Sequence, residues 1–126
     1  MRRVSEMMVS EVVTIDSSAS VAEAAKQMIQ EEKGTLPIVE GDQLHGMITD
    51  RDIVAHVVAE GRDNNSTTVH DIATRDLIAV GPDQDVEEAQ QLMDQHGLDR
   101  LLVVEEGRLV GLIWGTDIRS DEGLLP

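Results

Sequence analysis

The sequence predicts an α/β (α+β) protein made of two copies of one β-α-β-β-α unit. Two observations carry this prediction: the chain matches itself at an offset of 65 residues, and each copy repeats the same order of strand-like and helix-like patterns. Of the 51 pairs from Val4/Val69 to Val54/Arg119, 14 are identical, whereas about three would match by chance at roughly 6% per position. The chain therefore contains a duplicated unit.

Each copy should open with a short strand and a helix. The runs Val12–Ile15 and Leu77–Val80 are β-branched or aliphatic and are followed by turn formers, which is typical of strands. Helices should begin after Ser20 and Asp85, because each is followed three residues later by a glutamate, the spacing of a capping box. Apolar residues then recur at helical spacing in the first copy, at Val21, Ala24, Ala25, Met28 and Ile29.

A hairpin and a last helix should complete each copy. An apolar run, a polar turn and a second apolar run indicate a β-hairpin, with strands at Leu36–Val39 and Leu44–Ile48, then at Leu101–Val104 and Leu109–Trp114. The last helices should start after Thr49 and Gly115, and we expect Gly123 and Pro126 to cut the second one short.

The copies should be separate repeats joined by one linker. Residues 61–68 are polar and rich in turn formers, so we assign the first repeat to residues 1–60 and the second to residues 69–126. An α/β unit of this size leaves one face of its sheet uncovered. We expect the second repeat to cover it, sheet against sheet, with pseudo-two-fold symmetry and paired clefts.

Composition excludes several kinds of function. The net charge of −15 repels DNA, RNA and anionic membranes, and either a solvated surface or a high-salt habitat explains it. The chain has no cysteine, hence no disulfide, thiolate nucleophile or cysteine metal site. It shows no apolar run long enough for a membrane span and no signal peptide, so we expect it in the cytoplasm.

The repeated pattern resembles a tandem pair of CBS (cystathionine-beta-synthase) domains, a Bateman module. The residues that carry this resemblance are Leu36–Val39, which is similar to the middle strand of the family, and Leu44–Ile53, which is similar to its closing signature of Gly, two hydrophobic positions, Ser/Thr, two variable positions, Asp and a hydrophobic residue. The resemblance implies a non-catalytic regulator that binds AMP, ADP, ATP or S-adenosylmethionine in clefts between the repeats. It also implies a homodimer of four repeats that signals to a regulated protein.

Thr49 and Asp52 are the strongest candidates for a ligand site in the first repeat. They stand at the end of a strand and in the first turn of a helix, so both can face one ligand. A carboxylate can accept two ribose hydroxyls, while a hydroxyl and free amides at a helix start suit a phosphate. The alternative is that these residues only cap the helix.

Arginines and strand residues should complete the nucleotide site. Arg51 and Arg100 can reach phosphate oxygens, although a surface ion pair is an equal alternative for Arg51. By the resemblance, Thr49 and Asp52 work with the Arg100 region, and Asp117 works with residues 34–37. The resemblance further implies that adenine meets backbone groups and aliphatic walls at Thr14, Gly34, Thr35, Leu36 and Pro37, and at Val80 and Leu101.

The second repeat departs from the signature. Trp114 replaces the expected Ser/Thr, although Asp117 remains and Thr116 offers a nearby hydroxyl. Indole is too bulky to imitate a hydroxyl, so Trp114 fills the cleft, walls a purine, anchors a subunit contact or belongs to the core. We therefore expect one good nucleotide site rather than two.

Other functions have weaker support in the sequence. The four histidines lack the spacing of a metal site, so we expect structural or surface roles and no bound metal. No catalytic constellation or phosphate-binding Gly-rich loop is legible, so we expect no enzyme. The main alternative is a dimeric scaffold of the same fold without a ligand, which Trp114 and the scarcity of basic residues favour.

Overall fold

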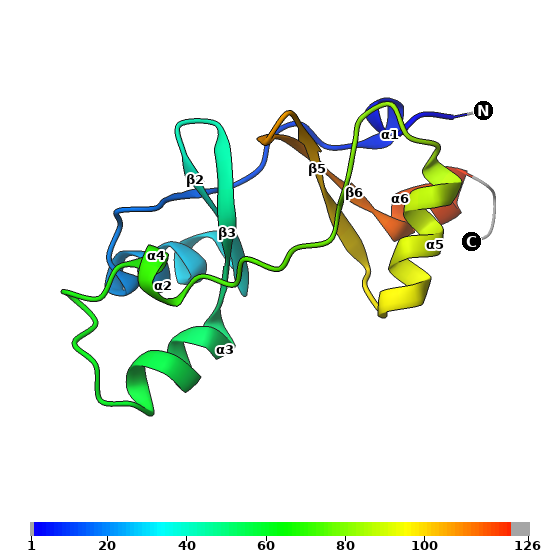
Figure 1. Cartoon of the computed structure of the whole chain (residues 1–126). Coiled ribbons are helices and arrows are strands. Elements are labelled where there is room, and N and C mark those ends of the chain that lie inside the picture. Colours follow the sequence, from blue (N-terminus) through cyan, green and yellow to red (C-terminus); the bar gives the residue numbers. More distant parts are fainter. Residues whose placement is uncertain (1, 122–126) are drawn as a thin grey trace. The chain divides into compact units, whose positions relative to one another are not determined.

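The computed structural model describes residues 2–121, which form two compact units (Figure 1). The middle unit comprises residues 13–77. The split unit joins residues 78–121 to the N-terminal residues 2–12. The start of the first sequence copy therefore packs in the same unit as the body of the second copy.

The middle unit is a three-stranded sheet with helices. Its elements are β1 (Ile15–Asp16), α2 (Val21–Glu31), β2 (Thr35–Glu40), β3 (Gln43–Thr49), α3 (Asp50–Ile53), the π-helical turn η1 (Val54–Val58) and α4 (Val69–Ile72). β1 pairs with β2 in parallel, and β2 pairs with β3 as an antiparallel hairpin.

The split unit repeats this order. It contains α1 (Val4–Met7), β4 (Ala79–Val80), α5 (Val86–His96), β5 (Arg100–Glu105), β6 (Arg108–Trp114) and α6 (Gly115–Asp121). β4 is parallel to β5, and β5 is antiparallel to β6. The predicted α/β class and the repeated β-α-β-β-α order are confirmed.

The first strand of each copy is shorter than predicted. β1 and β4 have two residues each, and the prediction that Val12–Thr14 and Leu77–Ile78 are strand is wrong. β1 has ladder partners only at Ile38 and Val39, and the carbonyl of Thr14 instead accepts a hydrogen bond from Gln27 Nε2 at 2.8 Å. At Thr14, the side chain of Gln27 therefore takes the place of a hydrogen-bond partner in β2. The expected helix breakers Gly123 and Pro126 lie outside the described residues.

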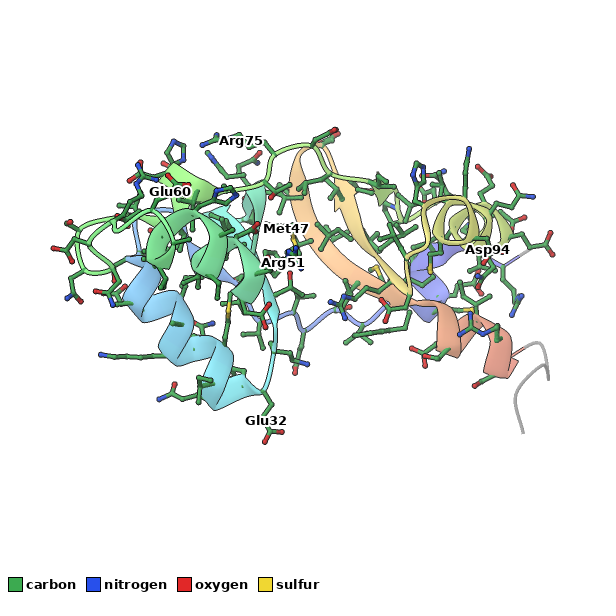
Figure 2. All side chains as sticks on the ribbon, turned by 90° about the horizontal axis from the view of Figure 1, so that it is seen from below. Glu32, Met47, Arg51, Glu60, Arg75 and Asp94 are labelled. Carbon is green, nitrogen blue, oxygen red and sulfur yellow. The ribbon has the colours of Figure 1, made fainter. Side chains whose placement is uncertain are left out.

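The two long helices begin where the sequence predicts. Ser20 Oγ accepts the amide of Glu23 at 3.1 Å, and the Asp85 carboxylate accepts the amide of Glu87 at 2.9 Å, so both act as N-caps. Glu32 caps the C-terminal end of α2 with a left-handed φ of 54° and projects from the helix end (Figure 2). A glycine, Gly97, ends α5 with φ 66°.

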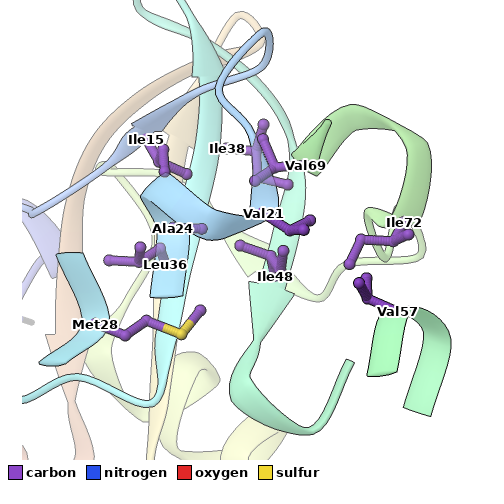
Figure 3. Close-up of a cluster of buried hydrophobic side chains, with 10 residues drawn as sticks. All are labelled: Ile15, Val21, Ala24, Met28, Leu36, Ile38, Ile48, Val57, Val69 and Ile72. Atoms are coloured by element: carbon purple, nitrogen blue, oxygen red, sulfur yellow. The ribbon is translucent and has the colours of Figure 1, made fainter. Parts of the chain in front are cut away.

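Each unit has its own hydrophobic core. In the middle unit, the buried face of α2 packs on β2 and β3, and η1 and α4 close the cluster (Figure 3). The side chains in it are Ile15, Val21, Ala24, Met28, Leu36, Ile38, Ile48, Val57, Val69 and Ile72. The split unit buries the equivalent set around Val86, Met93, Leu101 and Ile113, together with Val4 from the N-terminal segment.

Two short segments, which we call docking segments, occupy equivalent positions in the two units. Residues 2–9, with α1, dock in the split unit, and residues 67–74, with α4, dock in the middle unit. Val4 and Val69 are fully buried. Val9 exchanges two backbone hydrogen bonds with Leu112 at 2.8 and 2.9 Å, and Thr74 exchanges two with Met47 at 2.9 Å. The sequence patterns did not reveal these helices.

Within residues 2–121, no helix is both long and apolar enough to cross a membrane.

Candidate functional site

Thr49 and Asp52 hold the junction between β3 and α3 together. The Thr49 amide donates to Asp52 Oδ2 at 2.9 Å, and the Asp52 amide donates to Thr49 Oγ1 at 3.0 Å. This is a complete capping box. The helix cap therefore uses both residues, as the capping alternative expects.

The capping box leaves hydrogen-bonding capacity on both side chains. Thr49 accepts a hydrogen bond through its oxygen, so its hydroxyl proton is available to a ligand. Asp52 uses Oδ2, and among the described residues Oδ1 has no partner. Both residues are half-buried. The cap thus orients one donor and one acceptor at the same strand end.

The prediction that free amides at the start of α3 suit a phosphate is wrong. The Asp50 amide donates to the Gly34 carbonyl at 2.9 Å. The Arg51 amide donates to Asp50 Oδ1 at 2.8 Å, and the Asp52 amide serves the cap. All three amides are therefore satisfied within the chain.

The neighbouring strand β2 brings Gly34 and Thr35 to the same place. Thr35 lies opposite Thr49 in the hairpin register. Since β1 pairs only with Ile38 and Val39, residues 35–37 of β2 have no ladder partner in β1, although Pro37 is buried. Leu36 is fully buried in the core, so only its backbone can meet a ligand. Thr14 is half-buried just before β1.

Arg51 is the cation beside this junction. Its side chain is exposed, and it makes no ion pair with another described residue. The alternative, a surface salt bridge of Arg51, is therefore not observed among residues 2–121. The Asp50 carboxylate lies over Gly34, where an added Cβ would come within 3.2 Å of Asp50 Oδ2. Arg51 and Asp50 thus place opposite charges next to Thr49.

The second repeat builds a different junction. Arg100 and Trp114 occupy the positions of Thr35 and Thr49, opposite each other in the β5–β6 hairpin. The Arg100 guanidinium carbon lies 5.0 Å from the centroid of the Trp114 ring, a cation–π contact. Arg100 therefore stacks on an indole within its own hairpin.

The remaining predicted residues of the second repeat fall into two groups. Thr116 and Asp117 are exposed in the first turn of α6. Val80 and Leu101 are 2% exposed and belong to the core of the split unit. The sequence reasoning missed the Arg100–Trp114 stack, although counting the hairpin register from the polar turn between the strands places the two residues opposite each other.

A second capping box has the same chemistry as the Thr49–Asp52 pair. The Thr68 amide donates to Asp71 Oδ2 at 3.1 Å, and the Asp71 amide donates to Thr68 Oγ1 at 3.3 Å, at the start of α4. The Asp71 carboxyl has a pKa below its usual 3.8. The main cause is the hydrogen bond from the Thr68 backbone amide, and the hydrogen bond with the Thr68 side chain is the second. No predicted ligand residue lies in this cap, so it is an internal control for the first one.

Comparison with known proteins identifies the family. The sequence profile of the CBS domain matches residues 4–59 and again residues 69–118. The chain belongs to the CBS domain family. Each match begins within a docking segment. Residues 2–9 pack in the split unit and residues 67–74 pack in the middle unit, so a repeat in the sequence and a compact unit have different bounds.

The chain is similar to CBS proteins from bacteria. CBS domain-containing protein YhcV of Bacillus subtilis is 38% identical over 113 residues, which cover 90% of this chain and 80% of YhcV. Hypoxic response protein 1 of Mycobacterium tuberculosis is 34% identical over 114 residues, with coverage of 90% and 80%.

Two solved CBS structures contain bound groups. Hypoxic Response Protein I, solved with two coordinated zinc ions, matches with a TM-score of 0.84 at 33% identity, covering 96% of this chain and 99% of that one. The CBS domain pair of protein MJ0100, in complex with 5′-methylthioadenosine and S-adenosyl-L-methionine, matches with a TM-score of 0.75 at 29% identity, covering 98% and 97%.

The zinc ions belong to that other protein. In this chain, no three His, Asp or Glu side chains within residues 2–121 are grouped so that they could hold a metal ion. His45 and His70 are neighbours, with ring centroids 6.5 Å apart, and His56 lies 3.3 Å from Glu60. These contacts fit surface histidines that pair with nearby residues.

Proposed function

We propose that this CBS protein is a non-catalytic regulatory module that binds an adenine nucleotide, AMP, ADP or ATP, or S-adenosylmethionine, at the β3–α3 junction of the first repeat. The observation that carries the proposal is the Thr49–Asp52 cap, which presents a hydroxyl proton and a carboxylate oxygen beside a stretch of β2 that has no ladder partner in β1. The adenosine compounds bound by the similar MJ0100 pair support the same ligand class.

Each side chain has a distinct role in this proposal. Asp52 Oδ1 accepts hydrogen bonds from ribose hydroxyls, while the Thr49 hydroxyl donates to a phosphate or carboxylate oxygen of the ligand. Arg51 supplies the cation that an anionic ligand needs on a molecule of net charge −15. Backbone groups of residues 34–37 read the adenine edge. The participation of the Arg100 region and of Thr14 stays a prediction.

The second repeat is proposed to bind the ligand poorly or not at all. The Trp114 indole replaces the donor hydroxyl, and Arg100 is already stacked on its ring. Asp117 and Thr116 remain exposed at the helix start but lack the partner that Thr49 gives Asp52. We therefore propose one adenosine site per chain, with a homodimer that presents the ligand state to a regulated protein.

One observation favours a second candidate, a CBS scaffold without a ligand. The Asp50 carboxylate lies next to Gly34, close to where the proposed phosphate would bind, and like charge there opposes an anionic ligand. The ligand that binds with least opposition is then one with a positive group, such as S-adenosylmethionine. If no adenosine compound binds, the scaffold is the better description.

Thermal denaturation with each of the four compounds tests the proposal. A ligand present at about 100 times its dissociation constant should stabilise the native state by about 2.7 kcal/mol. Asp52→Ala should abolish that gain. Asp71→Ala removes the equivalent carboxylate from the other capping box, so it should cost a similar amount of stability and keep the gain.

The two variants separate capping from binding. A ligand gain that survives in Asp52→Ala would refute the site, even if the variant melts earlier. If the ligand stabilised neither variant, the lower stability of the variants alone would explain the loss of ligand stabilisation in Asp52→Ala. No gain with any compound in the wild-type chain would favour the scaffold.

A further inference from the structure

The N-terminal docking segment carries two adjacent methionines, Met7 and Met8. Both are partly exposed, and both pack against the hydrophobic core of the split unit. Met28 and Met93 are 5% and 0% exposed, so the protein around them keeps dissolved molecules away. A methionine thioether is oxidised where a dissolved oxidant can reach it. The segment therefore places two oxidisable side chains at the edge of a core.

The Met8 sulfur packs on the backbone of the β5–β6 hairpin. A Cβ added to Gly111 would come within 2.7 Å of Met8 Sδ and within 2.9 Å of the Val9 carbonyl oxygen. Because Gly111 has no side chain, the thioether fills the space above it. Next to it, Val9 and Leu112 exchange two backbone hydrogen bonds at 2.8 and 2.9 Å. Met8 thus lies beside the contact that holds this end of the segment on β6.

The duplication supplies an internal comparison, because the other docking segment makes the same crossing without sulfur. Met7 and Met8 correspond to Ile72 and Ala73. A Cβ on Gly46 would come within 3.2 Å of Ala73 Cβ, so a methyl group lies where the second repeat has the thioether. The crossing over the hairpin glycine therefore does not need a sulfur atom. Only the N-terminal segment can be oxidised at this point.

The two methionines differ in what their sulfur atoms contact. Arg2 Nη1 donates to Met7 Sδ at 3.8 Å. A sulfur lone pair that faces a guanidinium is less available to attack an oxidant, because the positive charge draws its electrons. Met8 Sδ has no hydrogen-bond partner among residues 2–121. Met8 is therefore the more reactive of the two.

We infer that Met8 is a reversible oxidation site, and that its oxidation by a peroxide detaches the end of the N-terminal docking segment from β6. With hydrogen peroxide, one oxygen atom bonds to Sδ, the O–O bond breaks, and the other oxygen leaves as water with both hydrogen atoms. The sulfur loses two electrons and the peroxide gains them. Two thiols reverse the step: they become a disulfide and remove the oxygen as water.

The sulfoxide does not fit where the thioether packs. Its oxygen is a strong hydrogen-bond acceptor, but the Val9 carbonyl oxygen beside it is also an acceptor, and Gly111 has no side chain to donate. An acceptor without a donor is costly away from water. The sulfoxide therefore turns toward solvent, which opens the hydrogen bonds between Val9 and Leu112. This inference goes beyond the proposed ligand, since no proposed ligand residue lies in residues 2–9.

Hydrogen exchange of the full chain before and after peroxide treatment tests the detachment. The amides of Val9 and Leu112 should exchange about tenfold faster in the oxidised protein, because each donates to the carbonyl of the other residue. The amides of Met47 and Thr74 form the same pair in the middle unit and should be unaffected. Methionine sulfoxide reductase with dithiothreitol should restore the slow exchange.

Three variants assign the effect to one sulfur atom. Met8→Leu keeps a similar volume without a thioether, so peroxide should no longer accelerate exchange at Val9 and Leu112. Met47→Leu removes another partly exposed methionine, on β3 (Figure 2), and should respond as wild type does. Met8→Gln places a polar acceptor at the same point and should show the faster exchange without peroxide. Circular dichroism checks that each variant is folded.

Three results would overturn the site. Peptide mass spectrometry should find Met8 oxidised faster than the buried Met93, and equal rates would show that Met8 is not accessible. A protein with Met8 fully oxidised and unchanged exchange at Val9 and Leu112 would show that the sulfoxide is accommodated. Faster exchange in peroxide-treated Met8→Leu would assign the effect to another residue. Ligand stabilisation should persist in Met8→Leu, so failure of the oxidation site and failure of the nucleotide site give different results.

Discussion

At the scale of single residues, the glycines of the repeated signature have a packing explanation. A Cβ on Gly46 would come within 2.8 Å of the Thr74 carbonyl oxygen, and one on Gly111 would come within 2.9 Å of that of Val9. Both carbonyls belong to docking segments that cross the hairpin there. The glycines are needed because another stretch of backbone passes over them.

Gly46→Ala should therefore destabilise the protein. The added methyl group meets backbone, which cannot rotate away as a side chain can, so we expect a loss of about 1–3 kcal/mol in the free energy of unfolding. Gly81→Ala is the matched control, because its Cβ would have no neighbour closer than 3.8 Å. Urea denaturation measures both, and equal stability of the two variants would contradict the packing explanation.

The Thr68–Asp71 cap should contribute to acid sensitivity. The pKa of Asp71 is lowered in the folded state, so its contribution to stability is present above about 3.8, the unfolded value, and is lost as the pH falls further through the folded pKa. Asp71→Asn should lose stability less steeply than wild type below that pH. Melting temperatures from pH 2 to 7 measure this, with the exposed Asp76→Asn as control; parallel curves for Asp71→Asn and wild type would rule the contribution out.

At the scale of elements, the sequence predicted what local chemistry determines. Ser20 and Asp85 start the long helices because their side chains satisfy amides a few residues away. α1 and α4 were missed because four residues show no helical period, and Val4 and Val69 are buried by residues distant in sequence. The Thr49 and Asp52 positions were predictable from the motif, but the engagement of the Asp50 amide depends on the carbonyl of Gly34, which is distant in sequence.

The docking segments predict a long-range effect of mutation. Val4→Ala and Val69→Ala each remove buried methyl groups from one core, and each should cost about 2 kcal/mol. Val4→Ala should increase hydrogen exchange mainly in residues 78–121, although they are far away in sequence. Val69→Ala should increase it mainly in residues 13–77. Increased exchange in residues 13–77 for Val4→Ala would contradict the assignment of residues 2–12 to the split unit.

At the scale of the whole molecule, charge is the property that composition predicts best. With twenty-five acidic and only ten basic side chains, the excess of carboxylates causes a net repulsion that is stronger in the folded state than in the expanded one. Salt screens this repulsion, since the Debye length falls from about 10 Å at 0.1 M to about 3 Å at 1 M. The melting temperature should therefore rise by several degrees between these NaCl concentrations, and a constant or falling value would show that repulsion is unimportant. Sucrose at equal osmolality is the control.

The split unit has a consequence for synthesis on the ribosome. Residues 13–77 contain every member of their own core, so the middle unit can form as soon as it has emerged. Residues 2–9 are made before their partners in the split unit and have to wait for them, because Val9 pairs with Leu112. At about 5–20 residues per second, that delay is on the order of 5–20 s. During this delay, residues 2–9 are exposed to proteases and chaperones, and a change made to them would act on residues 78–121.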